Sequence, residues 1–167
     1  MRFYITAAIP YVNAAPHIGH ALEFVEADTL ARYQRQKGND VCFVTGADEN
    51  SLKIVQAAEK EGISPQQLSD TYAVKFQEFL KSYNISIDIF QRSSSPEHKA
   101  SAQDLWRRCE QAGDIYKKSY KGLYCVACEL FYVKEELTEI GECRYHPGKK
   151  AEEVEEENYF FKLTNYT

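Results

Sequence analysis

The chain has 167 residues, of which 44% are hydrophobic and 27% charged, a composition typical of a globular protein large enough to bury a core. Its formal net charge of −5 excludes a general attraction to nucleic-acid phosphates, and no apolar run approaches the length of a membrane span. Because no basic and apolar leader is present, we expect a cytoplasmic protein, in which five cysteines favour metal binding or buried thiols over disulfides.

The N-terminal part of the sequence predicts a strand–helix–strand unit. Residues 2–9 and 41–45 are short apolar runs, and helical spacing of apolar residues extends over 21–37 between them. Such a unit requires parallel strands and a right-handed crossover. Ligands of these sheets bind at the carboxyl ends of the strands, so we expect the loops at 10–20 and 46–50 to lie close together.

The loop at 10–20 brings two imidazoles to the start of the predicted helix, where unpaired N–H groups and the helix dipole attract anions. His17 and His20 share one helix face, Gly19 leaves room for a flat ligand, and Pro16 suits the first helical position. A histidine pair alone is a weak signal, because histidines near a helix start are usually capping or solvated. The whole loop nevertheless predicts a site for a nucleotide phosphate.

An acidic residue, Asp48, follows the second predicted strand. Its carboxylate is suited to pair with a cationic ligand group such as an ammonium. The alternative is that Asp48 only caps the helix that starts near Ser51, and the sequence pattern does not decide between the two.

The elements predicted after this point are helices at 54–61, 65–83 and 96–112, with strands at 85–90 and 115–120. Trp106 and Cys109 lie on the apolar face of the last helix and are expected in the core. The acidic run 152–157 predicts a solvated connector. After it, 158–163 predicts a strand that returns towards the sheet.

Four residues in two close pairs indicate a metal site. Cys125 and Cys128 are separated by two residues, as are Cys143 and His146, and fourteen residues lie between the pairs. Thiolate and imidazole donors in this spacing suit tetrahedral Zn²⁺, and a full set of four protein ligands is typical of a structural site. Unrelated buried cysteines are the less favoured alternative.

The string Pro10-Tyr11-Val12-Asn13, followed by Pro16-His17-Ile18-Gly19-His20, resembles the first active-site motif of class I aminoacyl-tRNA synthetases. Together with Asp48, the zinc-knuckle pattern and the segment Asn158-Tyr159-Phe160-Phe161, it resembles the N-terminal portion of methionyl-tRNA synthetases. The resemblance covers essentially the whole chain. It implies an α/β fold with an incomplete Rossmann-like parallel sheet and an inserted zinc-knuckle subdomain.

The resemblance also implies a domain organisation. Residues 1–120 would form the first half of the catalytic domain, 121–157 a connective insertion with the zinc knuckle, and 158–167 the truncated start of a strand that returns to the sheet.

In such an enzyme ATP activates methionine to methionyl-adenylate, and the methionyl group then passes to tRNA(Met). The resemblance implies that His17 and His20 are catalytic and contact the ATP phosphates. The residues implied to bind ATP, together with Mg²⁺, are Pro10, Asn13, His17, Gly19 and His20. Those implied to bind methionine are Ala8, Ile9, Tyr11 and Asp48. The zinc ligands would be Cys125, Cys128, Cys143 and His146.

Two features depart from the family pattern. Where the family commonly has T-G-T-D-E-H-G, this chain has Thr45-Gly46-Ala47-Asp48-Glu49-Asn50-Ser51, with Asn50 and Ser51 in place of the histidine and glycine. The second ATP-binding motif, a lysine-rich K-M-S-K-S loop, has no counterpart in these residues. We therefore expect a fragment of a longer ligase that is inactive alone.

Other functions remain open at this stage. Isoleucyl, leucyl, valyl and cysteinyl synthetases share the histidine motif, and small-molecule nucleotidyltransferases carry a similar one. A non-catalytic zinc module that binds nucleotide or nucleic acid is a further alternative, although acidic residues in and beside the knuckle argue against phosphate binding. The sequence leaves the oligomeric state undecided.

Overall fold

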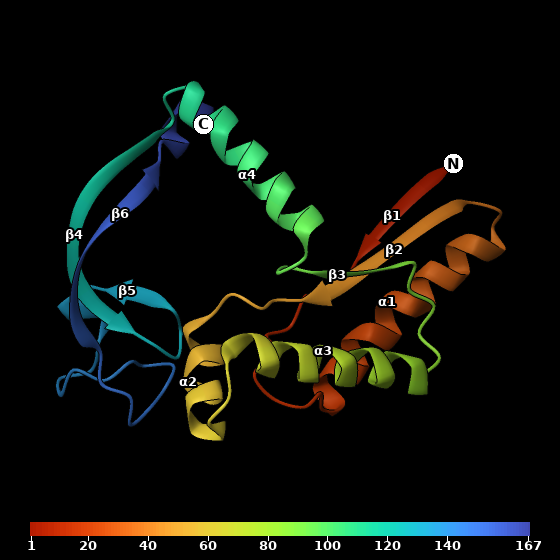
Figure 1. Cartoon of the computed structure of the whole chain (residues 1–167), viewed down its shortest axis with the longest axis horizontal. Helices are drawn as coiled ribbons and strands as arrows, with labels where there is room; N and C mark the ends of the chain where they lie inside the picture. The colour runs from red at the N-terminus through yellow and green to blue at the C-terminus, as the bar shows by residue number, and fades with distance from the viewer. The chain divides into compact units, whose positions relative to one another are not determined.

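The structure, a computed structural model, describes residues 1–167. The chain forms two compact units, residues 1–100 and 101–167, whose elements are shown in Figure 1. None of the helices combines the length and apolar character that crossing a membrane would require.

The first unit contains a three-stranded parallel sheet in the order β1-β2-β3. Its strands are β1 (Arg2–Thr6), β2 (Asp40–Ala47) and β3 (Ile89–Arg92). Gly46 lies where β2 and β3 approach closely, since a Cβ at this position would be 1.9 Å from the carbonyl oxygen of Gln91. The α/β class and the parallel sheet predicted from the sequence are confirmed.

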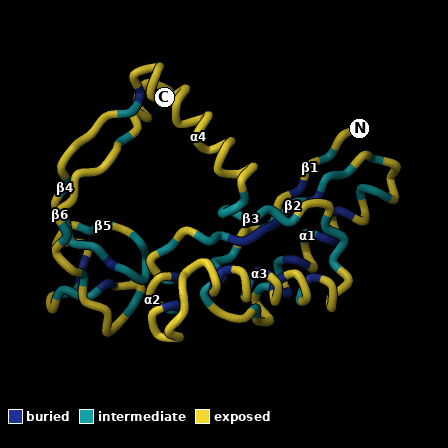
Figure 2. Tube along the Cα trace, in the orientation of Figure 1, coloured by how far each residue is buried: buried dark blue, intermediate teal, exposed yellow.

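Three helices pack against this sheet: α1 (Ile18–Gln36), α2 (Leu52–Glu61) and α3 (Pro65–Ser82). They lie on one face of the sheet, as Figure 1 shows, which is the arrangement expected when successive right-handed crossovers run in one direction. The core lies between helices and sheet, and its buried side chains include Val12, Phe24, Ala47, Ile54, Leu68, Phe76 and Leu80 (Figure 2).

The start of α1 differs from the prediction. The helix begins at Ile18 rather than at residue 21, and His17 is its N-cap. Pro16 therefore precedes the cap and does not occupy the first helical position. The imidazole of His17 accepts the N–H of Gly19 and so caps the first turn of the helix. This cap allows α1 to begin at Ile18.

The predicted strand at 85–90 is shifted, since β3 covers 89–92 and the residues before it form a loop. This loop is fixed to α1 by the buried Asp28, which accepts the backbone N–H of Ser86 at 2.8 Å and the Nε–H of Arg32 at 2.6 Å. The backbone N–H of Ser86 therefore finds its partner on α1 and not on a neighbouring strand.

The second unit holds an antiparallel sheet in the order β5-β4-β6. Its strands are β4 (Ile115–Cys125), β5 (Leu130–Tyr132) and β6 (Glu152–Phe161), and α4 (Pro96–Gln111) precedes them. One-turn 3₁₀ helices lie at η1 (Lys134–Glu136) and η2 (Leu163–Tyr166). No residue of α4 is buried, so the prediction that Trp106 and Cys109 lie in the core is wrong for this chain (Figure 2).

The acidic run 152–157 is part of β6 and not a solvated connector. β6 pairs with β4 along its whole length, and lysines of β4 offset the acidic charges. The Nζ of Lys117 lies 2.8 Å from Glu157, and that of Lys121 lies 2.9 Å from Glu153. Cross-strand ion pairs of this kind allow an acidic segment to form a strand.

Residues 158–161, which were expected to start a strand that returns to the parallel sheet, pair with β4 as the end of β6. Residues 115–120, which were expected in the first half of the catalytic domain, belong to the same antiparallel sheet. The predicted boundaries at 121 and 157 therefore fall inside β4 and β6. β4 and β6 pair as one antiparallel ribbon, and this ribbon contains residues of all three predicted domains.

Candidate active site and metal centre

The loop after β1 lies directly against the end of β2. Asp48 forms an isolated parallel bridge with Tyr11, in which the Asp48 N–H donates to Pro10 O at 2.9 Å and the Val12 N–H donates to Asp48 O at 3.3 Å. Val12 is fully buried in the core, which anchors the middle of the loop. The structure thus confirms that the loops after the first two strands lie side by side.

His17 and His20 hold the first turn of α1 through reciprocal hydrogen bonds. Nδ1 of His17 accepts the N–H of Gly19 at 3.1 Å, and Nδ1 of His20 accepts the N–H of His17 at 3.1 Å. The two rings lie 3.9 Å apart between centroids, with 33° between their planes. The structure therefore brings together the histidine pair that the sequence singles out.

These hydrogen bonds determine the tautomer of both neutral rings. A backbone N–H can only donate, so each Nδ1 must be the accepting nitrogen. In the neutral ring the proton is then on Nε2, which becomes a hydrogen-bond donor. The helix start consequently presents two Nε2–H donors that are not used for capping, and such donors suit an anionic oxygen.

His20 is the more enclosed of the two histidines. Its ring makes an edge contact with Phe76 at 5.2 Å and stacks towards Phe24 at 6.5 Å. Burial and the neighbouring charge of His17 lower the pKa of His20 below its ordinary value of 6.5, although Glu23 opposes this shift. The lowered pKa favours the neutral ring, whose Nε2 carries a proton.

Gly19 lies between the histidines and leaves space for one of them. A Cβ at this position would be 3.0 Å from Cε1 and 3.1 Å from Nδ1 of His17. A larger residue would therefore push the capping imidazole away from the helix start.

The residues predicted to bind methionine follow β1. Ala8 and Ile9 are exposed and Tyr11 is half-buried, with Nζ of Lys53 4.9 Å from the centre of its ring. Of the residues predicted to bind ATP, Pro10 and Asn13 are half-buried in the same loop.

Two residues that the sequence reasoning missed hold this segment in place. Oε1 of Glu23 accepts the N–H of Ala8 at 2.6 Å, and Oγ1 of Thr45 donates to the carbonyl oxygen of Ala8 at 2.8 Å. Glu23 lies three residues after His20 on α1, at a spacing that places it on the same helix face.

Asp48 is half-buried, and its Oδ1 accepts the N–H of Asn50 at 3.0 Å. The helix that follows is capped by Ser51, whose Oγ accepts the N–H of Lys53 at 3.1 Å. The alternative in which Asp48 only caps this helix is therefore wrong.

A buried ion pair fixes the residue after Asp48. The side chain of Glu49 is only 2% exposed, and its Oε1 accepts the Nε–H of Arg92 at 2.7 Å. Its Oε2 accepts the N–H of Ser94 at 2.9 Å. Nη2 of Arg92 also lies 2.5 Å from Asp70, so the loop after β2 is tied to β3 and α3. No motif in the sequence pointed to Arg92 as the partner of Glu49.

The second unit brings together the four predicted metal ligands. The ligand atoms of Cys125, Cys128, Cys143 and His146 all lie within 4.8 Å of one another. Sγ of Cys128 is 3.3 Å from Sγ of Cys143 and 3.1 Å from Nδ1 of His146. Around a tetrahedral Zn²⁺ with Zn–S bonds of about 2.3 Å, sulfur atoms lie roughly 3.8 Å apart. The two sulfur atoms need to separate by about 0.5 Å to reach this spacing, and the four residues could then hold the ion.

Charge in this group also favours a cation. Burial raises the pKa of the Cys143 thiol, but hydrogen bonds with His146 and Cys128 outweigh it and lower the pKa to about 6. Metals bind thiolates, so an easily deprotonated cysteine is suited to be a ligand. Cys42 and Cys109 lie outside the group, as the sequence predicts.

Comparison with known proteins gives one consistent result. Residues 3–165 match the family described as tRNA synthetases class I (M). The methionine–tRNA ligase of Synechocystis sp. is 46% identical over 98% of this chain, and that of Thermotoga maritima is 45% identical over 99%. These matches cover 31% and 27% of the two relatives, so this chain spans less than a third of their length.

A solved structure, the Mycobacterium tuberculosis methionyl-tRNA synthetase in complex with methionyl-adenylate, matches this fold with a TM-score of 0.91. It is 40% identical in sequence, and the match covers 99% of this chain and 33% of that chain. The family match spans nearly the whole chain, and both the fold and the relatives agree with it. The chain belongs to the methionine family of the class I tRNA synthetases.

Proposed function

We propose that this chain is part of a methionine–tRNA ligase and supplies one side of the site in which ATP and methionine form methionyl-adenylate. The observation that carries the proposal is the histidine pair at the start of α1, whose Nδ1 atoms cap the helix and leave both Nε2–H groups for a ligand. A helix N-terminus with two such donors suits the phosphates of ATP.

The proposed reaction is attack of the methionine carboxylate on the α-phosphate of ATP, with pyrophosphate as the leaving group. Negative charge increases on the phosphate oxygens in the transition state, and fixed donors stabilise it without becoming nucleophiles. We assign this role to His17 and His20. The remaining ATP-binding residues of the proposal are Pro10, Asn13 and Gly19, and Mg²⁺ accompanies the nucleotide.

Methionine would lie at the neighbouring end of the strands. Asp48 is assigned to the ammonium group, and its backbone bridge to Tyr11 supports this role because it places the acid beside the loop that follows β1. Ala8, Ile9 and Tyr11 are assigned to the methionine side chain, for which an apolar wall suits a thioether. Glu23 and Thr45 position Ala8 through their hydrogen bonds.

We assign a structural Zn²⁺ to Cys125, Cys128, Cys143 and His146, which would order the segment between β4 and β6. In the whole enzyme, residues 1–100 would form the first half of the catalytic domain and the antiparallel sheet would carry the zinc knuckle as a connective insertion. The rest of the enzyme would supply the second half of the ATP site and the surface for tRNA(Met).

The test is methionine-dependent exchange of pyrophosphate into ATP by the full-length protein, with leucine and cysteine as competing amino acids. We expect exchange with methionine alone and charging of tRNA(Met). Residues 1–167 by themselves should give no exchange, because the chain spans less than a third of its relatives. Exchange with leucine or cysteine, or robust exchange by residues 1–167 alone, would contradict the proposal.

A further inference from the structure

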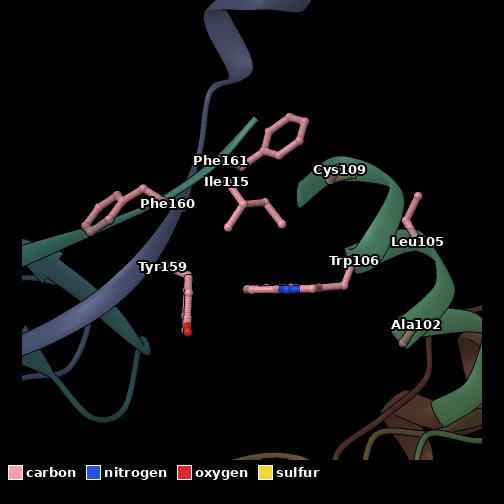
Figure 3. A pocket seen from close by; sticks show the side chains of 8 residues that line it. All are labelled: Ala102, Leu105, Trp106, Cys109, Ile115, Tyr159, Phe160 and Phe161. Atoms are coloured by element: carbon pink, nitrogen blue, oxygen red, sulfur yellow. The ribbon is translucent and has the colours of Figure 1, made fainter. Parts of the chain in front are cut away.

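The second unit contains an apolar cavity between α4 and the ends of β4 and β6, where Trp106 and Tyr159 face each other (Figure 3). Their rings make an edge contact at 5.1 Å, and none of the lining side chains carries a charge. The cavity therefore offers no charged group to a phosphate, a carboxylate or an ammonium.

In the first unit, by contrast, a carboxylate on α1 lies between two segments to which binding roles are assigned. Glu23 follows His20 by three residues and shares its helix face, and its Oε1 accepts the N–H of Ala8 at 2.6 Å. Its negative charge opposes the lowering of the pKa of His20, as expected for a carboxylate close to that ring. One side chain thus holds the segment after β1 and lies beside the histidine pair.

Side chains hold the peptide groups of Ala8 because the ladder between β1 and β2 ends just before them. The N–H of Ala7 still donates to the carbonyl oxygen of Val44 at 3.0 Å. Beyond this point Glu23 accepts the N–H of Ala8, and Oγ1 of Thr45 donates to the carbonyl oxygen of Ala8 at 2.8 Å. Hydrogen bonds to a charged acceptor are among the stronger ones in proteins, so the bond to Glu23 fixes Ala8 firmly to α1.

The two bonds attach Ala8 to different elements. Thr45 is fully buried on β2, three residues before Asp48, so its bond holds Ala8 beside the acid that we assign to methionine. Glu23 lies on α1, so its bond holds Ala8 relative to the helix start that we assign to ATP.

Each of these two regions also has internal contacts that do not involve Glu23. The backbone bridge between Tyr11 and Asp48 joins the loop after β1 to the end of β2. The reciprocal hydrogen bonds of His17 and His20 hold the first turn of α1. Loss of the Glu23 carboxylate would therefore leave both regions formed and would loosen one relative to the other.

We propose that Glu23 is a positioning residue that fixes the methionine-binding segment relative to the ATP-binding start of α1. This inference rests on the proposed function, because it requires both substrates to bind where they are assigned. The reaction joins the carboxylate of one substrate to the α-phosphate of the other, so its rate depends on the alignment of two separately bound groups. Glu23 acts on this alignment through Ala8 and takes no part in bond making.

The kinetics of methionine-dependent ATP–pyrophosphate exchange by the full-length protein test this assignment. Glu23→Ala should lower kcat by about 10- to 100-fold, with much smaller changes in the KM for methionine and the KM for ATP. Glu23→Gln keeps a carbonyl oxygen as acceptor for the N–H of Ala8, so it should retain most of the parent kcat. Thermal melts should show that both variants keep a stability close to that of the parent protein.

Thr45→Val is the matched variant for the other bond, because valine keeps the shape of the buried side chain and removes the hydroxyl. It releases Ala8 from β2 but not from α1, so it should raise the KM for methionine by about fivefold with little change in kcat. Glu26→Ala removes an exposed carboxylate from the same helix, and its exchange rate should equal that of the parent protein.

Three results would overturn the proposal. In the first, Glu23→Ala raises the KM for methionine without lowering kcat, which would assign Glu23 to the methionine segment alone. In the second, Glu23→Gln loses as much activity as Glu23→Ala, so that the acceptor for Ala8 is not the group that matters. In the third, the loss of activity follows a loss of thermal stability, which would make the contact a structural one only.

The parent protein separates this inference from the proposed function. A parent that gives no exchange with methionine contradicts the proposed function and, with it, this inference. A parent that exchanges normally, with Glu23→Ala equally active, contradicts this inference alone.

Discussion

At the residue scale, His17 and His20 each have two tasks assigned to two different atoms. Nδ1 accepts a helix N–H and fixes the ring. Nε2–H is the donor that we assign to the ligand. This division is possible because a neutral imidazole is both a donor and an acceptor. It also explains why neither lysine nor arginine could replace these residues, since both lack an acceptor for the helix N–H.

The pKa of His20 tests this arrangement. Burial and His17 lower the pKa of His20 in the folded protein below its ordinary value of 6.5. At a pH between this lowered pKa and that of the unfolded chain, the unfolded chain binds more protons than the folded protein. The free energy of unfolding should therefore fall as the pH drops through this range. We expect an NMR titration of the His20 ring to give a pKa below 6.5. Glu23→Gln should lower the pKa further and His17→Asn should raise it. Shifts in the opposite directions would contradict the described surroundings of His20.

Arg92 is predicted to hold the loop that carries Asp48. Arg92→Gln leaves the carboxylate of Glu49 buried without its ion partner, which should lower the free energy of unfolding by about 3 kcal/mol or more in urea denaturation. Asp70→Asn removes the other partner of Arg92. Because the side chain of Asp70 is 53% exposed, this variant should lower the free energy of unfolding by at most about 1 kcal/mol. Similar costs for the two variants would show that the buried pair has no special role.

At the element scale, the parts predicted well are those with a strong local pattern. The βαβ unit follows from two apolar runs around a helical period, and α3 begins at Pro65, where the sequence predicts a helix start. The two cysteine pairs also come together, because each is a short turn whose geometry depends on few residues.

The errors occur where distant residues decide the structure. The run 152–157 has the composition of a solvated segment, yet Lys117 and Lys121, more than thirty positions earlier, make it a strand. No local pattern contains that information. For the same reason the sequence does not reveal Arg92, which meets Glu49 only after β2 and β3 pair.

Removal of the metal tests the predicted zinc knuckle as an element. We expect one Zn²⁺ per chain by elemental analysis and, with a strong chelator, loss of the near-ultraviolet circular dichroism that arises from the aromatic residues of β4 and β5. The segment between these strands and β6 is short and polar, so it depends on the metal for its order. The parallel-sheet unit should keep its far-ultraviolet signal.

The matched variants use cysteines inside and outside the group. Cys128→Ser should reduce the zinc content and the protection of this segment from proteases. Cys42→Ser should leave both unchanged, since Cys42 lies on β2 away from the four ligands. Zinc bound equally well by Cys128→Ser would argue against the assigned ligand set.

At the scale of the whole molecule, the chain consists of a parallel-sheet unit, to which we assign one half of the nucleotide site, and a unit with an antiparallel sheet, to which we assign the zinc knuckle. The parallel sheet ends with β1 and β3 at its two edges, and the relatives are more than three times as long as the matched region. The proposed activity therefore belongs to the full-length protein. The hydrogen-bond donors that we assign to the ATP phosphates, on His17 and His20, nevertheless lie within the first twenty residues. The inactivity expected of residues 1–167 follows from the small share of the relatives' length that they match.

The most direct measurement of the central claim is the rate of methionine-dependent ATP–pyrophosphate exchange by the full-length protein with His17→Asn. Asparagine is a good N-cap and keeps an acceptor for the helix N–H, but it removes the Nε2–H donor. We predict that kcat falls by about 10²–10³ with the thermal stability unchanged, as for the loss of one preorganised donor to a developing anion. An exchange rate equal to that of the parent protein, at equal stability, would contradict the account.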